Sequence, residues 1–174
     1  MKRLVLAILI LTIFSVVGSA HEQTMTIKVY FLNEKFDPNL ENCTKVHPVK
    51  RSIPKTKGVA KVALEELFKG VMPEEKDKGY VSFSPEETKN ILKSIKIKNG
   101  AAYINFNKVV YEQLGVATTS CGSGFFSSVE NTLKQFPAIK KVFYAIEGSP
   151  RDFYDWVQVG DCPKELKNCS GKNF

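Results

Sequence analysis

Two alternating runs of apolar and polar residues, joined by Asn99-Gly100, constrain this chain more than any other stretch. Asn-Gly best accepts the positive φ angles of a tight type I′ turn, so residues 91–107 are predicted to form a β-hairpin. The turn fixes the register and puts these side chains on one face: Ile95, Ile97, Ala102, Ile104 and Phe106. The opposite face is polar and includes Lys96 and Lys98. The apolar face therefore needs a cover from elsewhere in the chain.

Two amphipathic segments are predicted to supply that cover as helices, over 59–69 and 125–136. Shorter helical turns are expected at 84–87 and 109–114, and further strands at 25–32, 46–53 and 141–147. The last of these strands is apolar on both faces, which is typical of an interior strand. The predicted fold is a single α+β domain: a mixed β-sheet with the two main helices on one face, plus a disulfide-tied C-terminal tail.

The first 20 residues have the features of a secretory signal. Lys2 and Arg3 are basic, a long apolar run starts at Leu4, and small residues occupy the −3 and −1 places of a cleavage site after Ala20. The alternative is an uncleaved membrane anchor, because the apolar run is long for a signal. Cleavage would give a protein exported to the periplasm, cell envelope or extracellular space, with membrane association expected only if the segment is retained.

The net charge of the chain limits the kinds of partner that we expect it to bind. The chain has 25 basic and 18 acidic residues, and loss of the signal leaves 23 basic against 18 acidic, a net charge of +5. This excess is compatible with adhesion to anionic wall polymer or lipid. No arginine-rich run or basic-aromatic patch is present, so we expect no nucleic-acid partner.

Four cysteines in an exported chain indicate two disulfides, with three connectivities open. Cys162 and Cys169 are close enough in sequence for a local loop, which would leave Cys43 to pair with Cys121. The chain has no Cys-x-x-Cys and two histidines, so we predict no metal site and no cofactor.

A series of short motifs follows the chain in order. They are Arg51-Ser52-Ile53-Pro54, ALEELFKG at 63–70, NGAAYINF at 99–106, and TLKQFP at 132–137 continuing to Gly148. This order resembles the GerMN domain, which is known from bacterial sporulation and germination proteins and from exported envelope proteins. The resemblance spans residues 25–148 and leaves 149–174 as a C-terminal extension. GerMN relatives tend to have cysteines at the places of Cys43 and Cys121, which favours that bridge. The resemblance implies an envelope binding or assembly module and supplies no catalytic residues.

The residues alone offer no convincing catalytic group either. The stretch around Cys121 is similar to the papain signature, but the nucleophile position falls on Gly124, and the last histidine, His47, lies upstream. The pairs Glu74-Glu75 and Glu86-Glu87 are expected to be solvated. Glu147 ends an apolar strand and is a candidate for a shifted pKa, but it has no partner acid. We therefore predict no catalytic residues and a protein that is not an enzyme.

The leading hypothesis is an exported, non-catalytic module that binds wall polymer or an envelope protein, linked to sporulation, germination or envelope assembly. Its candidate binding residues are Phe153, Tyr154 and Trp156 of the tail with Lys96 and Lys98 of the hairpin. The tail aromatics could instead pack against the domain. Two alternatives are a small secreted hydrolase acting on wall or polysaccharide, and a structural module that adds an exposed strand to an assembly.

Overall fold

The strands of the computed structural model, which describes residues 23–83, 88–114 and 122–174, form two three-stranded sheets. The predicted signal, the turn at 84–87 and Cys121 lie outside the described residues. The first sheet has the antiparallel order β2-β1-β3 and contains β1 (Thr24–Asn33), β2 (His47–Pro54) and β3 (Tyr80–Val81). The second has the order β4-β5-β6 and contains β4 (Leu92–Lys98), β5 (Ala101–Phe106) and β6 (Lys141–Ile146).

The α+β class is confirmed, but the strands form two sheets where one was expected. The second sheet is the mixed one, since β5 pairs antiparallel with β4 and parallel with β6. Strand β6 therefore lies at a sheet edge, and its prediction as an interior strand is wrong. The strand is apolar on both sides because helices and the C-terminal tail cover both of its faces.

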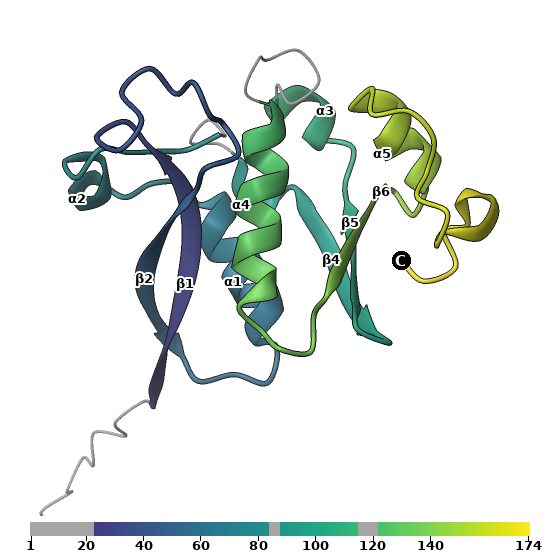
Figure 1. Ribbon diagram of the computed structural model, residues 1–174. Helices are drawn as coiled ribbons and strands as arrows, with labels where there is room; N and C mark the ends of the chain where they lie inside the picture. The colour runs from purple at the N-terminus through teal and green to yellow at the C-terminus, as the bar shows by residue number, and fades with distance from the viewer. Residues whose placement is uncertain (1–22, 84–87, 115–121) are drawn as a thin grey trace, which may run out of the picture.

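The two main helices, α1 (Val59–Phe68) and α4 (Gly122–Lys134), lie between the sheets and contact both of them (Figure 1). Helix α1 buries Ala63, Leu64 and Leu67 completely, as its apolar spacing predicts. Helix α4 begins three residues before its predicted start. Its first turn includes Gly124, which packs against Leu32 and the backbone oxygen of Cys43, where a Cβ would be only 3.2 Å from that oxygen. The described residues also form three short helices: α2 (Pro73–Lys76), α3 (Val110–Gln113) and α5 (Pro150–Trp156). Single 3₁₀ turns occur at Thr88–Asn90 and Lys167–Cys169.

The hairpin has the predicted register, with Ile97 opposite Ala102 and Ile95 opposite Ile104. Asn99 and Gly100 both have positive φ, as the turn requires. Ile104 and Phe106 are fully buried. Ile97 is 48% exposed, however, so the prediction that the helices cover the whole apolar face is wrong at this end. Here α4 has already ended and α1 is only beginning.

These exposures give a matched pair of variants. Ile104→Ala should lower the free energy of unfolding by ~2–5 kcal/mol, because the buried side chain leaves a cavity. Ile97→Ala should cost less than ~1 kcal/mol, since about half of that side chain is already in water. Chemical denaturation of both variants measures the difference, and equal losses would contradict the observed packing.

Helix α4 also protects the edge of β1 that faces away from β2, because β3 pairs there only with Leu32 and Asn33. The Gln135 side chain accepts a hydrogen bond from the Lys28 backbone N–H at 2.9 Å and donates one to the Lys28 carbonyl at 2.7 Å. Thr132 Oγ1 accepts from the Tyr30 N–H at 3.2 Å. These side chains take the place of a neighbouring strand and satisfy backbone groups that would otherwise attract another chain. This edge of β1 is therefore closed to strand addition.

The C-terminal tail covers the outer face of the second sheet. The Phe174 ring meets the edge of Tyr103 at 5.4 Å, and Tyr103 in turn packs on Phe143 at the same centroid separation. Lys96 donates a hydrogen bond to the Phe174 backbone oxygen, and Leu166 is 3% exposed. The tail is therefore part of the folded core and not a separate appendage (Figure 1).

The predicted bridge between Cys162 and Cys169 is present. The predicted partner of Cys43 lies outside the described residues, so the Cys43–Cys121 pairing stays a prediction.

Replacing both Cys162 and Cys169 with serine should lower the free energy of unfolding by ~2.5 kcal/mol through loss of the short-loop constraint. Denaturation of the double variant tests this, and an unchanged midpoint would mean that the tail is held by its other contacts alone.

Candidate functional site

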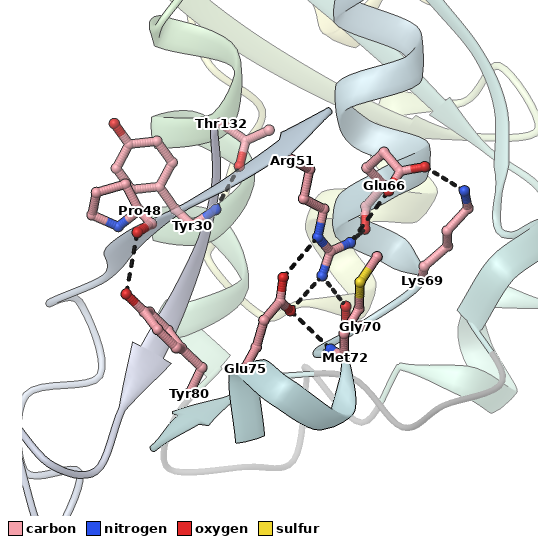
Figure 2. A network of polar contacts seen from close by, with 10 residues as sticks. All are labelled: Tyr30, Pro48, Arg51, Glu66, Lys69, Gly70, Met72, Glu75, Tyr80 and Thr132. Atoms are coloured by element: carbon pink, nitrogen blue, oxygen red, sulfur yellow. Dashed lines mark hydrogen bonds and ion pairs between the residues drawn. The ribbon is translucent and has the colours of Figure 1, made fainter. Parts of the chain in front are cut away.

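Arg51, on β2, is the centre of an extensive buried polar network in the described part of the chain (Figure 2). The side chain is 4% exposed and its guanidinium lies 5.4 Å from the centre of the Phe31 ring. It makes a two-point contact with the Glu75 carboxylate, at 3.1 Å from Nε and 2.7 Å from Nη2. Such paired hydrogen bonds between arginine and carboxylate fix geometry as well as charge.

The same guanidinium group caps the C-terminal end of helix α1. Nη1 donates to the carbonyl of Glu66, and Nη2 donates to the carbonyl of Gly70 at 2.6 Å. Carbonyls at a helix C-terminus have no partner within the helix, and a cation there also complements the helix dipole. Arg51 therefore joins β2, the end of α1 and the start of α2.

Lys69 and the Met72 backbone N–H complete the contacts of the two carboxylates in this network. The Glu66 carboxylate lies 3.5 Å from Arg51 Nη1 and also accepts from Lys69 Nζ. The Glu75 carboxylate accepts a third hydrogen bond, from the Met72 N–H at 2.8 Å. Two cations thus face two carboxylates whose oxygens are already occupied. This arrangement suits a structural joint, and it offers no free carboxylate for proton transfer.

The sequence did not reveal this network. Glu75 was expected to be solvated but is 5% exposed, and that expectation is wrong. The one available signal was Arg51 itself, an arginine at an inward position of a strand and within the first family motif. A cleft of about 540 Å³ lies beside the network between β2 and α1, and Glu66 and Lys69 are among its lining residues.

A second hollow, the hairpin groove, has a different character. We define it by its apolar residues Val59, Ile95, Ile97, Phe136 and Ala138, with Lys57 and Lys61 also lining it. Its volume is about 370 Å³. It lies where α1 begins, beside β4 and the connection from α4 to β6. The hairpin groove is therefore an apolar recess with cations along it, which can accept an apolar group next to a negative charge.

The structure corrects the binding role expected for the tail aromatics. Phe153 is fully buried and stacks on Tyr144 at 4.8 Å, and Tyr154 is 6% exposed. Burial raises the pKa of Tyr154 to about 12. Both residues lie on helix α5, which the Ser149 cap and Pro150 start three residues after the end of β6, and both are buried there. The expectation of a surface role for Phe153 and Tyr154 is wrong, and packing, the other interpretation left open, is what occurs.

The remaining predicted binding residues lie apart. Trp156 is half-buried and meets the Tyr111 ring edge-on at 5.4 Å. Lys96 contacts the tail, as described above. Lys98 is exposed beside the hairpin turn and makes no ion pair with the described residues. The structure thus does not bring the five residues into one surface.

Glu147, the candidate for a shifted pKa, is part of a surface ion pair. Its carboxylate accepts hydrogen bonds from Lys93 Nζ and from the Lys108 backbone N–H, the latter at 3.2 Å. The bond from Lys93 is the main reason that its pKa is lowered. A lowered pKa keeps the group ionised at neutral pH, so Glu147 is not set up to act as a general acid.

None of the helices within residues 23–83, 88–114 and 122–174 is long and apolar enough to cross a membrane. No group of three or more histidine, cysteine or acidic side chains is placed to hold a metal ion within the same residues. The prediction that the protein needs no metal or cofactor stays a prediction.

Comparison with known proteins decides the family. The family model for Germane, described as sporulation and spore germination, matches residues 28–152. The chain belongs to the Germane family. The match runs from β1 into α5 and so includes Arg51, Glu75 and the hairpin groove. The GerMN resemblance expected from the motifs is confirmed. A search of curated proteins found no match.

Three solved structures are similar to this Germane domain. The tandem GerMN domains of the sporulation protein GerM from Bacillus subtilis share 26% identity, with a TM-score of 0.53 over 72% of this chain and 39% of theirs. The first GerMN domain of the same protein shares 23% identity, with a TM-score of 0.49 over 71% of this chain and 84% of that one. A putative lipoprotein from Clostridium perfringens shares 18%, with a TM-score of 0.42 over 71% and 75%. The chain thus spans 39% of the tandem-domain structure.

Proposed function

We propose that this Germane domain is an exported, non-catalytic module that binds a component of the cell envelope, either wall polymer or a partner protein. Export is supported by the Cys162–Cys169 disulfide, because such bonds persist in oxidising compartments. The polar network around Arg51 supports the non-catalytic part, since its carboxylates are occupied by structural contacts.

The hairpin groove is the observation that carries the binding proposal. Ile97 belongs to the apolar face of the hairpin, yet 48% of its surface is exposed beside Phe136 and Ala138. The helices cover the rest of the hairpin's apolar face and leave the end at Ile97 open to solvent. Apolar recesses with a few polar groups at the edge are typical of binding sites. The groove is therefore the surface with which we expect the domain to bind.

Pull-down of the chain on purified envelope material tests this proposal. Ile97→Asp should weaken binding by ~10-fold or more, because an apolar contact is lost and a carboxylate enters the groove. Val159→Asp is the matched control, since Val159 is also exposed, at 55%, but lies outside the groove. Equal binding by the two variants would show that the groove is not the binding surface, and no binding by the unaltered chain would refute the function.

A further inference from the structure

One end of the fold, which we call the hairpin end, is basic. Four segments meet there: residues 23–27 at the start of β1, 54–61 before and within α1, 97–101 around the hairpin turn, and 135–141 between α4 and β6 (Figure 1). They contain no aspartate or glutamate. Their lysines are Lys55, Lys57, Lys61, Lys98, Lys140 and Lys141.

Acids from elsewhere neutralise only part of this charge. Lys61 pairs with Glu65 at 3.1 Å, and Lys141 pairs with Glu165 at 2.8 Å. Lys57, Lys98 and Lys140 are exposed and make no ion pair with any residue that the structure describes. The hairpin end therefore keeps at least three uncompensated cations, whereas the far end of the fold carries both signs, for example Glu34 and Lys35.

The hairpin groove opens at this same end. Its lining combines the exposed Ile97 with Lys57 and Lys61. Lysine stems can lie along apolar material while the ammonium groups reach for anions. An occupant that satisfies both features has an apolar part beside a layer of negative charge.

We propose that the hairpin end docks on an anionic lipid bilayer, with Ile97 at the level of the upper acyl chains and the lysines on the headgroups. This inference rests on the proposed envelope binding through the hairpin groove, and it adds the lipid bilayer to wall polymer and partner protein as a target. A hydrated polysaccharide would match the lysines but not the apolar recess. The chain also enters the fold here, because Gln23 pairs with Lys55 at this end, and the apolar run from Leu4 precedes it in the sequence. The sequence predicted membrane association only through a retained N-terminal segment, whereas this docking uses the folded domain itself.

Lysine-reactivity mapping on vesicles tests the docking face without depending on how the N-terminal segment behaves. The full chain would be mixed with phosphatidylcholine vesicles, or with vesicles containing phosphatidylglycerol, acetylated briefly and analysed by mass spectrometry. On the anionic vesicles we expect several-fold slower acetylation of Lys57, Lys98 and Lys140, with unchanged rates at Lys78, Lys164 and Lys172. Equal rates on both kinds of vesicle, or slowing at the second set, would overturn the proposal.

Charge-reversal variants sharpen the result. Lys61, which lines the hairpin groove, should also be acetylated more slowly on the anionic vesicles. The triple variant Lys57→Glu, Lys98→Glu and Lys140→Glu should abolish that slowing, whereas the triple variant Lys78→Glu, Lys164→Glu and Lys172→Glu should leave it intact. Slowing that survives the first triple variant contradicts docking by this end. If the chain binds wall polymer or an acidic envelope protein but shows no vesicle effect, the lipid target falls and the envelope-binding function stands. If it binds neither vesicles nor envelope material, both fall.

Discussion

Replacing Arg51 with methionine should lower the free energy of unfolding by ~3–5 kcal/mol, the largest effect of any single polar substitution that we expect in this domain. Methionine keeps an unbranched apolar stem and removes the guanidinium group with its charge. Glu75 would then remain buried with no cation, and the carbonyls of Glu66 and Gly70 would lose their donors. The cost therefore comes from an uncompensated charge more than from lost volume.

Urea denaturation of Arg51→Met measures this loss, and Lys61→Met is the control. Lys61 forms an exposed pair with Glu65, so its replacement should change stability by less than ~0.5 kcal/mol. The double variant Arg51→Met with Glu75→Met should recover part of the loss, because it removes the stranded carboxylate as well. A loss below ~1 kcal/mol for Arg51→Met would contradict the structural role of the network.

Phe153→Ala should destabilise the domain by ~3–5 kcal/mol. The ring is fully buried and lies within 6.4 Å of Phe106, Phe125 and Tyr144, so its loss opens a cavity in the aromatic core. Val159→Ala, in the same tail but exposed, should stay within ~0.5 kcal/mol of the unaltered chain. Melting temperatures that are equal for the two variants would mean that the tail is not part of the core.

The hairpin could be predicted from sequence because its information is local. Asn99-Gly100 specifies the turn, the turn specifies the register, and alternation then assigns the faces. How far those faces are covered is not local. Ile97 and Ile104 look alike in the pattern, and only the ends of α1 and α4 decide that one is exposed and the other buried.

The candidate site was harder to predict for the same reason. Arg51 and Glu75 are 24 residues apart, and nothing near either one in the sequence indicates that they meet. The tail aromatics resemble a recognition surface in composition, yet Phe153 lies buried on α5, which starts shortly after β6. Lys57, Lys98 and Lys140 belong to three separate segments, so their common end of the fold becomes visible only once the topology is known.

Envelope binding by Trp156→Ala, compared with Ile97→Asp in one assay, tests the central claim most directly. The proposed binding surface lies at the hairpin end, and the tail belongs to the folded core. We therefore predict that Trp156→Ala, assayed below its melting temperature, binds as the unaltered chain does, while Ile97→Asp loses ~10-fold or more. Loss of binding by folded Trp156→Ala with full retention by Ile97→Asp would contradict the account and return the binding surface to the tail.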